Sequence, residues 1–439
     1  MKAMRILPAT IVVVGLLVVV FLSLSRGQNP QNARDDALSH VELKEGGSEP
    51  VRIRETLLCS LPNGVQWSDC IISPAYDSVA YRVSDGQRSF YVIDGISQSS
   101  YHEVGEFVFS PDGTRHAYWG KTGKLVFSVI DGKEAGSYDD VSSFRFSADS
   151  KRWACAVNHV QVVVDGVPRK KYGGVGRPLF SPDSRRLAFI AIEDWEAFVV
   201  VDGEEGTRYE AITRGSVTFS PDSRRVAYLA KRNNRWLLVC DGDEGTAYGE
   251  GVFRRVALSS DGKRTAFVTA IGGGFSVIVD GVPGPVYDGI QNEGPVFSAD
   301  SRSCAYGARR GNARFCVLDG TEGDTYDGVS GLTFHPRGGD LTYFAQKGDK
   351  WCIVEAGIRG DLVECLGKGL LVYSRDGSHS AHAQMNSDRT YSVFLDGTPI
   401  GSYANLYVNE GLRFDEADAL VFVATRGKDV YRVQASGSG

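Results

Sequence analysis

A short motif that returns every 34 to 41 residues limits the fold of this chain more than any other feature. The motif is Phe-Ser-Pro-Asp followed by Gly or Ser, and ten units carry it in full or degenerate form. An internal period of this length indicates a stack of similar structural units that bury their apolar faces against one another. The clearest copies are Phe109–Gly113, Phe146–Ser150, Phe180–Ser184, Phe219–Ser223 and Phe297–Ser301.

A second motif, Asp-Gly at the end of an apolar stretch, recurs in phase with the first, as at Asp202-Gly203 and Asp241-Gly242. Each unit therefore predicts four short strands, which we name A to D in chain order. Strand A ends at Phe-Ser, a Pro-Asp turn leads into strand B, strand C ends at Asp-Gly, and strand D carries a tyrosine such as Tyr209 or Tyr248. The Ser and Asp side chains of the A–B turn are expected to accept hydrogen bonds from backbone N–H groups.

Strands B and C are apolar on both faces, as in residues 198–201, whereas a strand with one exposed face would alternate. We therefore predict an all-β fold, a β-propeller of about ten four-stranded blades in a single ring. Two smaller propellers are the alternative, but no break in the repeat spacing separates two halves. The last unit lacks a strand D, and the alternating segment Val51–Leu58 is expected to supply it and close the ring.

The motif, followed by Arg-x-Ala and an apolar strand, resembles the WD-repeat-like blades of TolB-type periplasmic propellers over about residues 60–437. The resemblance implies a propeller outside the cytoplasm and is weak evidence for any particular function. Two features depart from the family pattern. The Glu-Gly pairs at Glu205 and Glu244 are foreign to it, and ten units exceed both its blade number and the usual range of about four to eight.

The N-terminus predicts a membrane anchor. Residues 6–25 carry no charge, span about 30 Å as a helix, and follow Lys2 and Arg5. This pattern places residues 1–5 in the cytoplasm and residues 6–25 in the membrane as a signal anchor. Residues 26–50 then form a flexible linker to a propeller of residues 51–439, which lies in the periplasm or outside the cell. A cleaved signal peptide is the alternative, because Ser23 and Ser25 form a small-residue site.

Export makes disulfides permissible for the eight cysteines of the chain. Cys352 and Cys365 flank a turn and are the candidate pair, and Cys304 with Cys316, or Cys59 with Cys70, are weaker ones. Buried free thiols are the alternative for all of them.

The sequence predicts no catalytic, cofactor-binding or metal-binding residue. No Cys-x-x-Cys or Gly-x-Ser-x-Gly motif occurs, and the histidines are scattered apart from His379 and His382. The acidic run Asp241–Glu244 resembles a calcium ligand set only superficially, because turn chemistry accounts for its aspartates. A net charge of −6 also argues against nucleic acid as a partner.

Charge is distributed unevenly between the two faces predicted for the ring. The loops that join strands B and C hold 14 basic and seven acidic residues, although the chain is acidic overall. Trp195, Trp236 and Trp351 lie at the ends of these loops, where they either contact a partner or pack against neighbouring blades. The candidate partner-binding residues are Lys231, Arg232, Arg235, Trp236, Arg309, Arg310, Arg314, Lys347 and Trp351.

These features favour a membrane-tethered, extracytoplasmic propeller that acts as a non-enzymatic binding or scaffold module. Its expected partner is a protein or an anionic component of the bacterial envelope, besides the membrane itself. The alternative is a carbohydrate-active or hydrolytic propeller enzyme whose site is assembled from loops. Carboxylates or histidines clustered within about 6 Å at the channel mouth would favour the enzyme.

Overall fold

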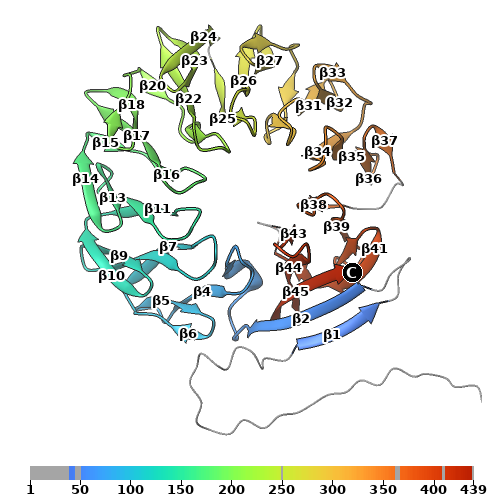
Figure 1. Cartoon of the computed structure of the whole chain (residues 1–439). Helices are drawn as coiled ribbons and strands as arrows, with labels where there is room; N and C mark the ends of the chain where they lie inside the picture. Colours follow the sequence, from blue (N-terminus) through green and yellow to red (C-terminus); the bar gives the residue numbers. More distant parts are fainter. Residues whose placement is uncertain (1–38, 45–50, 249–250, 361–365, 408–410, 438–439) are drawn as a thin grey trace, which may run out of the picture. The chain divides into compact units, whose positions relative to one another are not determined.

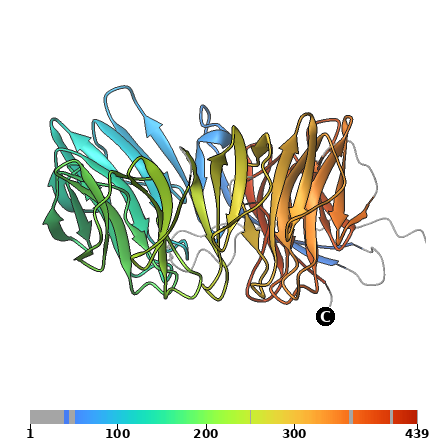
Figure 2. The same cartoon turned by 90° about the horizontal axis from the view of Figure 1, so that it is seen from above.

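The computed structural model describes residues 39–44, 51–248, 251–360, 366–407 and 411–437. These residues form ten antiparallel β-sheets, and no α-helix occurs among them. The sheets follow one another in chain order around a single ring (Figure 1), which Figure 2 shows from its edge. The predicted ten-bladed propeller is therefore confirmed, and the alternative of two propellers is wrong. Nowhere in these ranges is a helix long and apolar enough to cross a membrane, and the predicted anchor at 6–25 lies outside them.

Blades 1 to 5 run from the first sheet after the closing strand to residue 248. Blade 1 contains the 3-10 helix η1 (Trp67–Asp69) before β3 (Cys70–Ile72), β4 (Val79–Ser84), β5 (Ser89–Ile93) and β6 (Ile96–Ser97). Blade 2 contains β7 (Glu103–Phe109), β8 (His116–Thr122), β9 (Leu125–Ile130) and β10 (Lys133–Tyr138). Blade 3 contains β11 (Val141–Phe146), β12 (Trp153–Val157), β13 (Gln161–Val164) and β14 (Val167–Lys171). Blade 4 contains β15 (Gly174–Val175), β16 (Leu179–Phe180), β17 (Leu187–Glu193), β18 (Glu196–Val201) and β19 (Glu204–Glu205). Blade 5 contains β20 (Ala211–Ile212), β21 (Thr218–Phe219), β22 (Val226–Arg232), β23 (Arg235–Cys240) and β24 (Asp243–Tyr248).

Blades 6 to 10 complete the ring. Blade 6 contains β25 (Val252–Leu258), β26 (Thr265–Ile271), β27 (Gly274–Val279) and β28 (Val282–Pro283). Blade 7 contains β29 (Gly289–Ile290), β30 (Val296–Phe297), β31 (Cys304–Arg310), β32 (Ala313–Leu318) and β33 (Thr321–Glu322). Blade 8 contains β34 (Gly328–Phe334), β35 (Leu341–Lys347), β36 (Lys350–Glu355) and β37 (Ile358–Arg359). Blade 9 contains β38 (Leu366–Tyr373), β39 (Ser380–Met385), β40 (Tyr391–Leu395) and β41 (Thr398–Tyr403). Blade 10 contains β42 (Asn405–Leu406), β43 (Arg413–Phe414), β44 (Leu420–Arg426) and β45 (Asp429–Gly437), to which β2 (Val51–Ser60) and β1 (Ser39–Lys44) are added.

The hydrophobic core is divided among the seams between neighbouring blades. Between blades 4 and 5, for example, Ala188 and Val199 pack against Tyr228 and Val239 in one cluster of buried side chains. Both faces of strands B and C are buried in this way, which explains why they do not alternate. Each blade consequently depends on two neighbours for its burial, and a ring meets that need without special end blades.

The ring closes where β2 pairs with β45, in a register that runs from Val51 opposite Gly437 to Ser60 opposite Asp429. Val51 and Ile53 are buried against blades 9 and 10, so the strand contributes side chains as well as backbone hydrogen bonds. The predicted closing strand is therefore confirmed, with two further residues at its end.

One strand lies inside the segment 26–50, which the sequence analysis predicts as a linker. β1 (Ser39–Lys44) pairs with the outer edge of β2, from Ser39 opposite Thr56 to Lys44 opposite Val51. The linker prediction is wrong for these six residues. An outer strand exposes a row of unpaired N–H and C=O groups that can capture a polar segment, which composition does not reveal.

Candidate functional site

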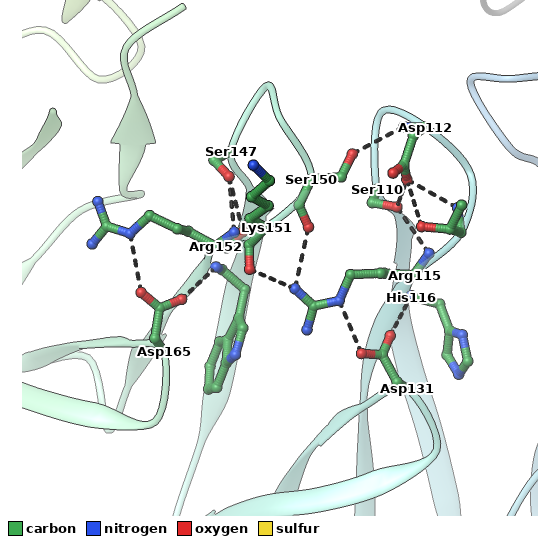
Figure 3. Close-up of polar contacts among 12 residues, drawn as sticks. Ser110, Asp112, Arg115, His116, Asp131, Ser147, Ser150, Lys151, Arg152 and Asp165 are labelled. Atoms are coloured by element: carbon green, nitrogen blue, oxygen red, sulfur yellow. Dashed lines mark hydrogen bonds and ion pairs between the residues drawn. The ribbon is translucent and has the colours of Figure 1, made fainter. Parts of the chain in front are cut away.

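The face of the ring formed by the A–B and C–D turns, called here the A–B face, repeats one set of polar contacts. In blade 2 the Ser110 hydroxyl donates to Asp112 at 2.6 Å and accepts from the Arg115 backbone N–H at 2.9 Å, as Figure 3 shows. The same pair of contacts recurs in blade 4, where Ser181 donates to Asp183 at 2.5 Å. The expected turn chemistry is thus confirmed.

An arginine at the start of strand B links each of several blades to the next. Arg115 Nε contacts Asp131 at 2.9 Å and Nη1 donates to the Lys151 carbonyl of blade 3 at 2.7 Å (Figure 3). Its guanidinium lies 5.3 Å from the Phe146 ring centroid. The other carboxylate oxygen of Asp131 accepts from the His116 N–H at 3.0 Å. Equivalent ion pairs are Arg152 with Asp165, Arg186 with Asp202, Arg225 with Asp241 and Arg264 with Asp280. The charges of this face therefore hold the fold together.

The opposite face, called here the B–C face, is formed by the hairpin tips between strands B and C. Two predicted binding residues on it are already occupied by intramolecular ion pairs. Arg232 contacts Glu244 at 2.5 Å and lies over the Tyr209 ring, and Arg310 forms a two-pronged pair with Glu322 at 2.9 and 2.7 Å over Tyr287. Glu244 belongs to one of the two Glu-Gly departures from the repeat family, and Glu205 of the other contacts Lys170 at 2.6 Å, so ion pairs give both departures a structural explanation.

The remaining cationic candidates form no ion pair with a described carboxylate. Arg309 donates to the Gly311 and Asp288 carbonyls at 3.1 Å, and Arg314 donates to the Asp327 carbonyl at 2.5 Å, so backbone oxygens fix both guanidinium groups. Within the described ranges Lys231, Arg235 and Lys347 have no carboxylate within 4.0 Å, and Arg235 and Lys347 are exposed.

The three tryptophans of the B–C face differ in their surroundings. Trp236 and Trp351 are half-buried, and Trp351 packs against Phe344 and Leu371 at the seam between blades 8 and 9. Trp195 is 96% exposed. Packing therefore accounts for Trp351, whereas none of the described residues covers the Trp195 side chain.

Six of the seven described cysteines are buried free thiols, and Cys59 is partly buried. Burial raises the pKa of Cys70, Cys155 and Cys304 to about 12, which disfavours the nucleophilic thiolate. Cys59, Cys70, Cys304 and Cys316 are free thiols, so the two weaker disulfide predictions are wrong. Cys316 lies opposite Gly307 across its hairpin, which explains why Cys304 does not meet it. Cys352 is buried, and Cys365 lies outside the described residues, so that pair stays a prediction.

Carboxylates and histidines are dispersed. Asp241 pairs with Arg225, Glu244 pairs with Arg232, and the buried ring of His382 stacks on Phe394 at 4.8 Å. Glu106 on an inner strand accepts from the backbone N–H groups of residues 143 and 144, and burial raises its pKa. Over the described ranges no group of three or more His, Cys, Asp or Glu side chains is placed to hold a metal ion.

The candidate site is a cavity of about 450 Å³ on the B–C side of the seam between blades 6 and 7. This volume lies within the range of about 300–1,000 Å³ that small-molecule sites occupy. Its walls combine apolar, amide and cationic groups: Val268, Phe275, Ile290, Gln291, Asn292 and Arg255, together with Gly289 and Gly294.

Glycines give the inner strand of blade 7 room beside this cavity. Gly307 makes room for the Gln291 side chain, whose amide donates to the Val329 carbonyl of blade 8. A Cβ at Gly289 would lie 3.3 Å from Arg309 Nε, so the predicted binding residue Arg309 packs on Gly289 without lining the cavity. Among the described lining residues, Arg255 supplies the guanidinium group. This arrangement suits an anionic group attached to an apolar or aromatic body.

Sequence reasoning missed Arg255, Phe275 and Gln291 as members of one site. Gln291–Pro295 separates the two short strands β29 and β30 in blade 7, but blades 4, 5 and 10 have the same interruption, so the sequence did not distinguish this seam. Such a break releases side chains from the regular ladder and turns them toward the seam.

Comparison with known proteins adds no assignment. No protein-family model matches the chain, and no curated protein matches it. A crystal structure of the eukaryotic initiation factor is similar over 83% of this chain and 90% of that one, with 13% identity and a TM-score of 0.43. An oligogalacturonate lyase in complex with manganese is similar over 68% of this chain and 96% of that one, with 12% identity and a TM-score of 0.33. The predicted TolB-type relationship stays a prediction.

Proposed function

We propose that this chain is a non-enzymatic binding module, held at a membrane by residues 6–25 with its propeller outside the cytoplasm, whose B–C face binds a protein or an anionic component of the envelope. The cavity between blades 6 and 7 carries the proposal. Arg255 lines it, and Phe275 and Ile290 give it an apolar wall. The described lining includes no carboxylate and no histidine, which are the usual groups for hydrolysis.

The cationic surroundings extend this site across the face. Lys231, Arg235 and Lys347 add positive charge that no neighbouring carboxylate within 4.0 Å neutralises among the described residues. Exposed cations attract an anionic partner over roughly one Debye length, about 8 Å at physiological ionic strength. The cavity supplies the specific contact, and the surface charges speed the encounter.

Binding of indole-3-acetate to the full chain in detergent tests the site, because this probe joins an aromatic ring to a carboxylate. We expect saturable binding by calorimetry that weakens as salt rises, and its loss in Arg255→Glu and Arg309→Glu. Arg185→Glu and Arg224→Glu impose the same charge change on the exposed part of the A–B face and should leave binding intact. Equal loss in both pairs would refute the assignment of the face.

Membrane attachment has its own test. Because residues 6–25 are apolar and follow two cationic residues, the full chain should stay with membranes through a carbonate wash. Recovery of a soluble form that begins near Arg26 would show a cleaved signal peptide instead.

A further inference from the structure

The hairpin tip of blade 4 exposes a tryptophan in a strained backbone conformation. Asp194 and Trp195 have φ values of 51° and 69°, as the two central residues of a tight hairpin turn require. A bulky residue at positive φ is rare, since its Cβ crowds the backbone. The indole is nevertheless 96% exposed, so packing within the chain does not compensate for the strain. Strain of this kind at an exposed side chain indicates a role in binding.

Other tips of the same geometry carry residues that tolerate positive φ. The blade 5 tip is Asn233-Asn234 at 51° and 59°, and the blade 6 tip includes Gly272 and Gly273. Asparagine and glycine adopt this conformation at low cost. Blade 4 therefore presents a large aromatic side chain where local conformational preference favours a small or polar one.

The residues around this tip are acidic. Glu193 and Glu196 pair across the turn, and Asp194 and Glu196 are exposed. Arg208 holds Glu193 at 3.4 Å and its guanidinium lies 4.5 Å from the Phe198 ring centroid, which fixes the base of the hairpin. The tip is thus an aromatic side chain within a cluster of negative charge.

The complementary surface lies on the same face of the same ring. The cavity between blades 6 and 7 has an apolar wall and is lined by Arg255, and Arg309 and Arg314 lie opposite each other in the neighbouring hairpin of blade 7. Interface hot spots are enriched in tryptophan and arginine and lie in well-packed pockets.

We propose that two copies of this chain dock through their B–C faces, with Trp195 of each copy inserted into the blade 6–7 cavity of the other. This inference rests on the proposed function of that cavity. Blade 4, which carries the tip, and blades 6 and 7, which line the cavity, lie on either side of blade 5 (Figure 1). A two-fold axis in the contact plane near blade 5 therefore superimposes both contacts at once. Such an interface is closed and self-complementary. The uncharged tip Asn233-Asn234 of blade 5 lies nearest the axis.

Sedimentation velocity of the full chain in detergent, over a range of protein concentrations, tests the pairing. Trp195→Asn should weaken association by at least about thirty-fold, the fold-change that corresponds to a hot-spot side chain. The same variant should unfold at an unchanged or higher temperature, because asparagine suits the turn. His159→Asn, at the equivalent tip of blade 3 with φ 59°, is the matched control and should associate like the wild type. Unchanged association in Trp195→Asn would overturn the proposal.

Charge exchange gives an independent test of the contact. Glu196→Lys and Arg255→Glu should each weaken association, and the double variant should recover it, since the two-fold brings each new lysine against a new glutamate. If the loss of association in the double variant equals the sum of the losses in the two single variants, the result contradicts this geometry.

Binding of indole-3-acetate to Trp195→Asn separates the two proposals, because this variant leaves the cavity lining intact. Saturable probe binding without any self-association in the wild type would refute the pairing and leave the proposed function standing. Loss of probe binding in every variant, with no self-association, would refute both.

Discussion

The two faces of the ring use charged residues in different ways. On the A–B face the same ion pair returns in successive blades, as Arg115 with Asp131 and Arg186 with Asp202. On the B–C face each tip is different, and one of them exposes Trp195. In a repeat protein, a polar contact that recurs in phase with the repeat stabilises the fold, whereas an exposed residue that breaks the repeat is a candidate for function. The predictions below test this distinction.

Both faces depend on the closing strand, so its removal should have the largest effect. Deletion of residues 39–60 removes β1 and β2, the ladder to β45, and the buried side chains of Val51 and Ile53. We expect the free energy of unfolding to fall by about 3 kcal/mol or more, as measured by urea denaturation. Unchanged unfolding would contradict closure through β2.

Acid should loosen the A–B face. Burial of Asp112 acts to raise its pKa, but hydrogen bonds from Ser110, Thr114 and Ser150 outweigh it and lower the pKa from 3.8 to about 2. The Ser181 hydroxyl likewise lowers the pKa of Asp183. Because these folded-state values lie below the unfolded ones, the stabilisation is present above about pH 4 and is lost as pH falls toward 2.

Urea denaturation at pH 5 and at pH 2.5 measures this effect. Stability should fall over that interval, and Ser181→Ala should reduce the size of the fall because it removes one of the bonds that favour the carboxylate. A fall of the same size in Ser181→Ala would assign the acid sensitivity to other groups.

A single arginine of the A–B face should have a moderate effect. Arg186→Ala removes the 3.0 Å contact to Asp202, the bond to the Arg224 carbonyl and the packing on Phe219, and should cost about 1–2 kcal/mol. Arg185→Ala is the matched control one residue earlier. Because the Arg185 side chain is exposed, its removal should change the free energy of unfolding by less than about 0.5 kcal/mol. Equal losses would show that net charge, and not the contact, is responsible.

The smallest effect is a gain. In blade 7 the arginine position holds Ser303, although Asp319 is in place and accepts from the Cys304 N–H at 2.8 Å. Ser303→Arg should restore the ion pair and raise the free energy of unfolding by about 0.5–1 kcal/mol. Ser303→Lys supplies the charge without the planar fork and should give less. A loss of stability with arginine would show that the blade 7 turn differs from its relatives.

The repeat and its phase predict the ten blades, the turn chemistry and the closing strand, because these depend on local pattern and on burial of both faces of each sheet. The role of particular charges could not be predicted in the same way. Arg232 and Glu244 are separated by twelve positions in the sequence and meet only through the register of adjacent strands and the packing against Tyr209. Trp195 and Trp236 look alike in the sequence, but one occupies a turn apex and the other a strand opposite Tyr248.

The cavity depends on contacts between blades. It forms where the interrupted inner strand of blade 7 meets the hairpin of blade 6. No short-range pattern in the chain records that meeting, so Arg255 and Phe275 could not be assigned to it in advance.

Hydrogen exchange of the full chain in detergent, with and without saturating indole-3-acetate, tests most directly the claim that the B–C face binds and the A–B face holds the fold. We expect the amides of residues 289–294 and of the hairpin 268–275 to exchange more slowly when the probe is bound, and those of the turns 110–115 and 220–225 to remain unchanged. Protection confined to the turns of the A–B face, or no protection anywhere at saturation, would contradict the claim.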